Sequence, residues 1–278
     1  MCRLSVYQAI CTASTSTPFS ASTCRDGRAV QGGGFRCRSS PIVSHRRMTG
    51  VIRTRQLSSK APYVASEATV SGSACHWMAE KVLKQELIDL DPTEHFVGQK
   101  YKDGDIEVTI DEKLVKKALA YSNYVFKKQE EMEAEMLIEE KLYVHEVNDH
   151  LFGTADIILI GKDKISLIDL KSGKWPVEVI DNGQLKIYTL GAVARWGGDY
   201  QYENVIFQNG KAKETTLDLH ELVDWGLGYL TDCVDAALEK NPKEVVGQQC
   251  LLCKGKAYCK SYNNFTENGG KILWKPTR

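Results

Sequence analysis

Hydrophobic positions recur at helical spacing in two stretches of the first half of the chain. Apolar side chains such as Trp77, Val82 and Leu87 stand among lysines and glutamates, which predicts an amphipathic helix over residues 72–90. The same spacing predicts a second helix over residues 111–135. The end of this second stretch is rich in lysine and glutamate, so we interpret it as a solvated helix face.

Three consecutive stretches then have the apolar character of β-strands. They cover residues 136–144, 153–161 and 164–171. The turn Gly161-Lys162-Asp163 between the last two suits a tight antiparallel hairpin. The centre of the chain is therefore predicted to be a small β-sheet.

The pattern returns to helices and strands in the second half. A helix is predicted over residues 181–196, strands over 202–210 and 212–219, and a last helix over 220–240. The complete order is helix, helix, three strands, helix, two strands, helix. This order predicts a mixed α/β domain with helices on both faces of the sheet.

The first 60 residues differ from the rest in composition and charge. They are rich in serine, threonine, arginine and glycine, and they contain nine arginines and one lysine against the single acid Asp26, a sum of +9. The other 26 bases and 35 acids sum to −9, which gives the net charge of zero. We expect residues 1–61 to be a disordered basic segment. An organellar transit peptide and an altered version of an ordered N-terminus remain alternatives.

Composition excludes several classes of protein. The chain has 278 residues, of which 42% are hydrophobic and 26% charged, so it is globular and not collagen-like, coiled-coil or largely disordered. No run approaches the roughly 20 consecutive apolar residues of a membrane-spanning helix. We therefore expect a soluble protein without a membrane partner.

The nine cysteines indicate a reduced compartment. Their number is odd, and the chain does not start with the apolar core of a signal peptide, so a secreted disulfide framework is not expected. Cys250, Cys253 and Cys259 form a C-x2-C-x5-C group. Thiolates at this spacing favour an iron–sulfur cluster or Zn²⁺, and a four-coordinate site needs one further ligand from elsewhere in the chain.

Candidate catalytic residues lie on the predicted hairpin. Asp156 stands near the start of one strand, and Asp169 and Lys171 stand at the end of the next, so an antiparallel pair brings them to the same end. Carboxylates hold Mg²⁺ or Mn²⁺ with positions left for water and phosphate, and a nearby lysine stabilises developing charge. The competing interpretation is a surface hairpin with ordinary polar residues.

Residues in neighbouring elements strengthen the catalytic interpretation. Glu139 lies in the preceding strand, spaced to reach the same face. Gln184 and Tyr188 occupy positions i and i+4 of the next helix and share one of its faces. An ordinary helix packed on the sheet explains Tyr188 equally well.

The order of these motifs resembles a known group of enzymes. GSACHW, EEKLYV, FGTADIIL, LIDLKSGKWPVEV and NGQLKIYTLGA follow one another as in the RecB-like branch of the PD-(D/E)XK nuclease superfamily. More closely, they resemble a phage-associated family of this superfamily whose members are largely uncharacterised. The resemblance covers residues 62–262 and implies a restriction-endonuclease-like mixed sheet, followed by a tail over 263–278.

The resemblance implies a role for each matching residue at the metal. Asp156 and Asp169 would ligate Mg²⁺ or Mn²⁺, and His76 would complete the ligand set or approach the scissile phosphate. Lys171 would assist the attacking water, and Glu139 would be an accessory acid. Without the resemblance, a lone histidine on a helix is more often structural.

The resemblance also implies contacts with the substrate and a cluster. Gln184 and Tyr188 would position the DNA backbone or the lysine. Relatives bind a 4Fe–4S cluster through three C-terminal cysteines and one upstream cysteine, and the cluster joins the two ends of the chain. The C-terminal residues that match here are Cys250, Cys253 and Cys259. Cys37 is the preferred fourth ligand, and Cys24 and Cys75 are alternatives. Relatives have this cysteine closer to His76, in a stretch that corresponds to residues 38–74, which contain no cysteine here.

These observations predict a divalent-metal-dependent deoxyribonuclease. An exonuclease in phage or bacterial DNA recombination or processing is preferred, with DNA and recombination or replication proteins as partners. The alternatives are a non-catalytic DNA-processing scaffold and a zinc-stapled interaction domain. The charge of −9 on the core opposes binding of a polyanion. The bacterial or phage-infected cytoplasm is the expected location, and the basic N-terminus leaves mitochondrial or plastid import open.

Overall fold

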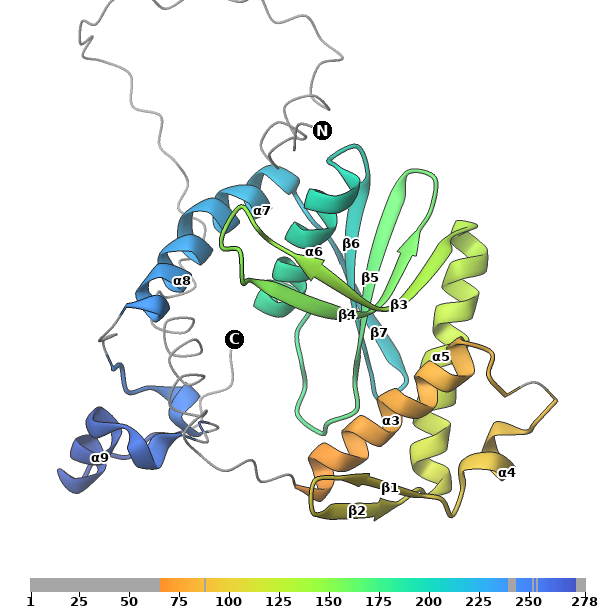
Figure 1. The fold of residues 1–278 in the computed structure, drawn as a ribbon, viewed down its shortest axis with the longest axis horizontal. Coiled ribbons are helices and arrows are strands. Elements are labelled where there is room, and N and C mark those ends of the chain that lie inside the picture. The colour runs from red at the N-terminus through yellow and green to blue at the C-terminus, as the bar shows by residue number, and fades with distance from the viewer. Residues whose placement is uncertain (1–65, 88, 240–243, 252, 254, 274–278) are drawn as a thin grey trace, which may run out of the picture. The chain divides into compact units, whose positions relative to one another are not determined.

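The computed structural model describes residues 66–87, 89–239, 244–251, 253 and 255–273 (Figure 1). The predictions for residues 1–61, Cys24 and Cys37 lie outside the described residues. The described residues divide into two compact units, the parts of Tyr63–Leu230 and of Thr231–Arg278 that the structure describes. The predicted domain bounds of 62–262 stay a prediction. The candidate catalytic residues all belong to the first unit.

The first unit is built on a mixed five-stranded sheet of order β3-β4-β5-β6-β7. Strands β5 and β6 are parallel, and every other neighbouring pair is antiparallel. The mixed α/β architecture predicted from the hydrophobic pattern is therefore confirmed. The strands are β3 (Glu135–Tyr143), β4 (Phe152–Ile160), β5 (Lys164–Lys171), β6 (Gln201–Gln208) and β7 (Lys211–Thr216).

Helices cover both faces of this sheet. Helix α6 (Gly183–Trp196) connects β5 to the parallel strand β6, as a crossover between parallel strands must. Ile206 of β6 packs with Leu185 of α6 on one face. Val205 and Phe207, the neighbours of Ile206, pack on the other face in a core shared with helices α3 (Glu67–Leu83) and α5 (Glu112–Met132). The alternation of a β-strand thus supplies both layers.

Close backbone approach fixes α6 against the outer strands. A Cβ added to Gly191 would lie 2.8 Å from Cβ of Leu142 in β3. A Cβ added to Gly153 in β4 would overlap the ring of Tyr188. These two glycines let the helix lie directly on the β3–β4 hairpin, which carries part of the candidate site.

The region between the first two helices differs from the prediction. We expected one helix over 72–90, but α3 begins after its N-cap Ser66 and ends at Leu83, with Gln85 at φ 54°. A short helix α4 (Pro92–Phe96) follows, capped by Asp91. Strands β1 (Lys100–Asp103) and β2 (Ile106–Thr109) then form a hairpin that the pattern did not predict. Four-residue strands are too short to give a clear alternation.

The predicted last helix is also interrupted. It consists of α7 (Leu219–Trp225), a π-helical turn (Gly226–Leu230) and α8 (Thr231–Leu238). The boundary between the two units falls at the end of the π-helical turn. The second unit contains α8, two short 3₁₀ helices (Gln248–Leu251 and Lys256–Tyr258) and α9 (Lys260–Glu267).

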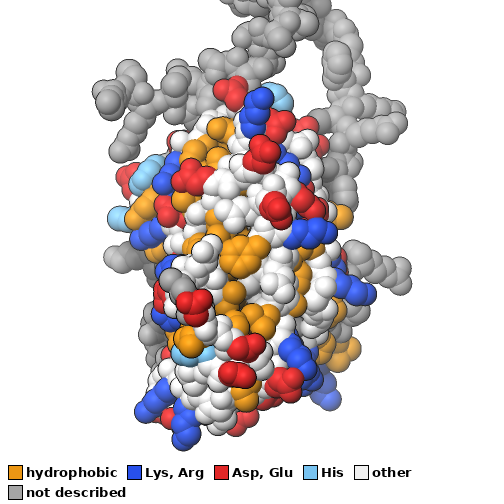
Figure 2. Space-filling view, turned by 90° about the vertical axis from the view of Figure 1, so that its right-hand side faces the viewer, with side chains coloured by type: hydrophobic (Ala, Val, Ile, Leu, Met, Phe, Trp, Pro, Cys, Tyr) orange, Lys and Arg blue, Asp and Glu red, His pale blue; other side chains and the backbone are white. Residues whose placement is uncertain are grey.

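The surface in Figure 2 mixes charges of both signs. Acidic and basic side chains are interspersed around hydrophobic ones on this face, without a single extended basic region. Because the charges on this face are mixed, specific binding of a polyanion there would need local features rather than the general field of the protein.

Among the described helices, none combines the length and the apolar character that crossing a bilayer requires.

Candidate metal centre

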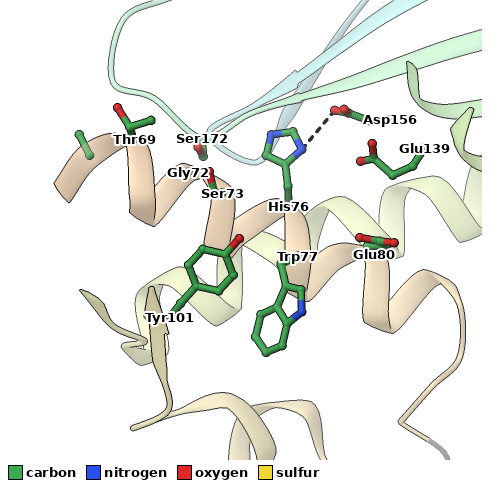
Figure 3. Close-up of a pocket in the computed structure, with 11 residues that line it drawn as sticks. Thr69, Gly72, Ser73, His76, Trp77, Glu80, Tyr101, Glu139, Asp156 and Ser172 are labelled. Carbon is green, nitrogen blue, oxygen red and sulfur yellow. Dashed lines mark ion pairs between the residues drawn. The ribbon is translucent and has the colours of Figure 1, made fainter. Parts of the chain in front are cut away.

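One nitrogen and two oxygen donors converge from three different elements. His76 comes from α3, Glu139 from β3 and Asp156 from β4, and one ligand atom of each lies within 4.8 Å of the other two. Nδ1 of His76 is 3.4 Å from Oδ2 of Asp156, and the carboxylate of Glu139 lies beside them (Figure 3). Ligands of one Mg²⁺ or Mn²⁺ ion lie within roughly 4 Å of each other. Only a small adjustment would therefore let the three bind one cation.

A break in the β3–β4 ladder aims the two carboxylates at this point. Ile138 pairs with Ile157, and Glu140 pairs with Ala155, but the rung between them, Glu139 and Asp156, is not paired. Glu139 has φ 54°, a left-handed conformation that costs a residue other than glycine about 1–3 kcal/mol. The site therefore stores backbone strain at one of its candidate ligands.

The same break changes the face of the sheet to which the side chains of β3 point. Ile138 packs with the core under α3 and α5, whereas Glu140, two residues further on, pairs with Arg195 of α6. Residues two apart on a regular strand share a face. The change of face at Glu139 brings its carboxylate to the edge where α3 presents His76.

Burial and mutual repulsion shape the protonation of these groups. Burial and, after it, the charge of Asp169 raise the pKa of Asp156, while the backbone N–H of Leu170 and the charge of Lys171 lower it; the net result is a pKa of about 7. Burial followed by the charge of Asp156 also raises the pKa of Glu139. Burial lowers the pKa of His76, and the charge of Asp169, which raises it, offsets this only in part. The imidazole is therefore kept in the neutral form that binds metals, and it adds no positive charge to offset the carboxylates.

Asp169 belongs to a neighbouring network and not to the group of three. Its side chain is 3% exposed, and Oδ2 lies 2.7 Å from Nζ of Lys171 in an ion pair whose geometry does not make a hydrogen bond. Gln184 donates from Nε2 to Oδ1 of Asp169 at 3.0 Å and to the hydroxyl of Tyr188 at 2.7 Å. Lys171 donates to Oε1 of Gln184 at 3.2 Å. Asp169 is therefore held by Lys171 and Gln184, while Asp156 accepts a hydrogen bond from the backbone N–H of Leu170, the residue that follows Asp169.

The predicted site residues thus divide into two adjacent sets. His76, Glu139 and Asp156 form the compact donor group, while Asp169 and Lys171 form the ion pair beside it. The sequence placed Glu139 as an accessory acid and Asp169 as a ligand. The geometry puts Glu139 closer to the other donors, because the broken rung redirects it.

An open cleft of about 630 Å³ leads to the donor group. Its walls come from α3, from Tyr101 on the β1–β2 hairpin and from Ser172 after β5. Figure 3 shows Trp77 and Tyr101 on one side of His76, with Glu139 and Glu80 on the other. A ligand of considerable size can therefore reach the metal ligands from outside.

Sequence reasoning did not identify Tyr121 as part of this site. Tyr121 lies on α5, is 2% exposed and has no hydrogen-bond partner for its hydroxyl among the described residues. It lines a small space with His76, Glu139 and Asp156. Burial, followed by the charges of Asp156 and Asp169, raises its pKa well above the ordinary value. Its position in the apolar pattern of a helix gave no signal beyond that of a core residue.

The cysteines of the second unit form a separate candidate site. Cys250, Cys253 and Cys259 are each 7–8% exposed and are not in disulfides. Burial raises the pKa of Cys259, and the Glu244 carboxylate and the Cys250 thiol raise it further. Buried free thiols are the residue type that binds iron–sulfur clusters or Zn²⁺. Among the described residues, however, the three sulfur atoms do not converge within 4.8 Å of one another as the donors of the metal centre do, so the cluster stays a prediction. Cys75, an alternative fourth ligand, is fully buried in the core of the first unit, where burial raises its pKa to about 11.

The strained backbone at Glu139 predicts an unusual order of variant stabilities. At φ 54°, glycine is tolerated without the penalty of a side chain, so we expect Glu139→Gly to be more stable than Glu139→Ala by about 1 kcal/mol. Denaturant unfolding measures this difference. At Glu140, in a regular part of the strand, the order should reverse. A less stable Glu139→Gly than Glu139→Ala would contradict the assignment of strain.

The raised pKa of Asp156 predicts how stability depends on pH and on cations. The folded protein holds this proton more tightly than the unfolded chain, so the contribution of Asp156 to stability is complete below about pH 4 and lost as the pH rises through about 7. At about 1.4 kcal/mol per pKa unit, the loss amounts to a few kcal/mol.

Thermal unfolding of metal-free protein between pH 5 and 8 tests this expectation. Asp156→Asn should flatten the decline, whereas Asp105→Asn, in the exposed β1–β2 turn, should not. Mn²⁺ should raise the melting temperature more at pH 8 than at pH 5, because the ionised site binds it. An equal effect at both pH values would argue against binding at these carboxylates.

Comparisons with known proteins place the chain in a family. One solved structure that matches is titled "Crystal structure of SSO0001", with a TM-score of 0.30 and 13% identity, over 78% of this chain and 98% of that chain. The model of the family DUF2800, described as "Protein of unknown function", matches residues 43–269. That match includes every described residue of the candidate metal centre and all three cysteines of the second unit. The chain therefore belongs to the DUF2800 family.

Proposed function

We propose that this protein is a divalent-metal-dependent nuclease that hydrolyses phosphodiester bonds in DNA. The observation that carries the proposal is the convergence of His76, Glu139 and Asp156 beside the ion pair of Asp169 and Lys171. The resemblance of the sequence motifs to RecB-like nucleases of the PD-(D/E)XK superfamily supports the same activity.

The donor set is suited to a divalent cation. Two carboxylates and one imidazole would hold Mn²⁺ or Mg²⁺, and a cation in this position supplies a nucleophilic water at neutral pH and neutralises charge on the phosphate. The imidazole of His76 favours Mn²⁺ over Mg²⁺, since Mg²⁺ prefers oxygen donors. Because its acids repel a polyanion, the site would have to take up a cation before the DNA can approach.

Lys171 would act on the reacting phosphate. Its side chain is 26% exposed, and its ammonium group is held by Asp169 and Gln184, which orient it. A fixed positive charge here would stabilise the charge that develops on the phosphate oxygens and would orient the attacking water. Gln184 and Tyr188 would act as positioning residues, since they hold Asp169 and so fix the lysine.

Asp169 would assist binding of the cation through its negative charge, in addition to holding Lys171. Its buried Oδ2 has unused capacity to accept a hydrogen bond, and its charge already acts on Asp156 and His76. A cation that enters the site would be attracted by this carboxylate as well as by the three donors. The cysteine site of the second unit is assigned a structural role, which an iron–sulfur cluster or Zn²⁺ would both fulfil.

A cleavage assay on defined DNA substrates tests the proposed activity. Labelled linear single-stranded, linear duplex and closed circular DNA are incubated with the protein and Mn²⁺ or Mg²⁺. We expect degradation of linear DNA that is faster with Mn²⁺ and abolished by EDTA, as for an exonuclease. Cleavage of closed circles would replace exonuclease with endonuclease.

Matched variants connect the activity to the site. Asp156→Asn, Glu139→Gln and Lys171→Ala should each lower the rate by about 100-fold or more, because each removes a ligand or the fixed positive charge. Asp105→Asn and Lys102→Ala, on the exposed β1–β2 hairpin, should leave it unchanged. Wild-type activity in the Asp156 and Lys171 variants would refute the proposal, and DNA binding without cleavage would indicate a scaffold.

A further inference from the structure

Two aromatic side chains are exposed at the free end of the β3–β4 hairpin. Tyr143 and Phe152 are directly paired across the strands, and they are 41% and 45% exposed. Their ring centroids are 5.9 Å apart, and His145 stacks on Tyr143 at 5.2 Å with an interplanar angle of 5°. Exposed aromatic side chains gathered in this way are typical of binding surfaces rather than of solvated strands.

A lysine extends over both rings. Nζ of Lys141 is 3.8 Å from the ring centroid of Phe152 and 4.9 Å from that of Tyr143. His145 pairs with Asp149 of the turn at 3.7 Å, and Glu146 is the other acid of that turn. The hairpin therefore carries a cation directly over the aromatic surface. We call Lys141, Tyr143, His145 and Phe152 the hairpin platform.

The platform is on the side of the hairpin that faces away from α6. On the α6 side, Leu142 meets Gly191, and Gly153 lies against the ring of Tyr188. Side chains alternate along both strands, so Tyr143 and Phe152 lie on the opposite side. Strand β5 pairs with β4 only from Ile157 onwards, and the hairpin extends beyond it (Figure 1). Helix α6 therefore does not cover these rings.

The platform is connected to the candidate metal centre along a single strand. Phe152 precedes Asp156 by four residues, a distance of about 13 Å along β4 at the usual strand rise. Next to Phe152, Gly153 is fixed by Tyr188, which is hydrogen-bonded to Gln184 and through it to Asp169. The platform and the metal ligands thus stand at a defined separation.

We propose that the hairpin platform binds unpaired bases of a single-stranded DNA segment or a frayed DNA end. This inference rests on the proposed nuclease function and names the form of its substrate. Aromatic rings bind single strands by stacking on the bases, which contributes about 1–3 kcal/mol per base. The flexible Lys141 side chain would leave the ring faces to the bases and pair with a phosphate of the same strand. A closed duplex has its base faces occupied by neighbouring bases, so it cannot use the rings in this way.

Binding to short fluorescent oligonucleotides tests the platform without cleavage. Fluorescence anisotropy is measured in EDTA with the full chain, for a single-stranded oligonucleotide and for its blunt duplex. Tyr143→Ala/Phe152→Ala should raise the Kd for the single strand about 10- to 100-fold, the equivalent of stacking one or two bases, and change that for the duplex less than about threefold. The exchange variant Tyr143→Phe/Phe152→Tyr keeps both rings and should bind as the wild type does. An unchanged Kd, or an equal loss for single strand and duplex, would overturn the proposal.

Cross-linking of the wild type keeps the test valid if the alanine variant folds poorly. A single strand that contains 5-iodouracil is irradiated with the unmodified protein, and the attached peptide is identified by mass spectrometry. We expect attachment at Tyr143, His145 or Phe152; attachment only outside residues 141–152 would overturn the platform.

The two proposals fail in different ways. If the wild type cleaves DNA but the alanine variant binds single strands normally, the platform is wrong and the nuclease stands. If the alanine variant loses single-strand binding but the wild type does not cleave DNA with any divalent cation, the platform stands and the nuclease is wrong.

Discussion

Repulsion between buried carboxylates is the constraint on which the candidate site depends. Glu139, Asp156 and Asp169 meet where β3, β4 and β5 separate, and burial adds to their mutual repulsion. Such a group is held at neutral pH by protons or by a cation. The fold supplies the ammonium group of Lys171 to this cluster, and that group pairs with Asp169. The other two acids, with His76, are left to a cation from solution.

The surrounding architecture maintains this arrangement in spite of its energetic cost. The broken rung of the β3–β4 ladder keeps Glu139 in a left-handed conformation, and α3 closes the site from the other side with His76. Helix α6 fixes the hairpin through Gly191 and Gly153 and holds Asp169 through Gln184. Because these contacts come from the core of the unit, they hold the candidate ligands in position without a cation. This preorganisation is what a metal-dependent hydrolase would need.

The sequence predicted the elements that have strong periodicity and the residues that strand geometry aligns. The antiparallel pairing of β4 with β5 follows from the hydrophobic pattern and the turn at 161–163, and alternation places Asp169 and Lys171 on one face. The positive φ of Glu139 could not be predicted, since no glycine marks it. Consequently the position of Glu139 beside His76 and Asp156 was not foreseen. Tyr121 was hidden in an apolar helical pattern, and β1 and β2 are too short to show a period.

The most direct measurement of the central claim is the position of a bound cation. Crystals soaked in Mn²⁺ and measured at the manganese absorption edge reveal the ion by its anomalous scattering. The account predicts a peak bound by Nδ1 or Nε2 of His76 and by carboxylate oxygens of Glu139 and Asp156, at about 2.0–2.2 Å. The absence of a peak there, or a peak bound by other groups alone, would contradict it.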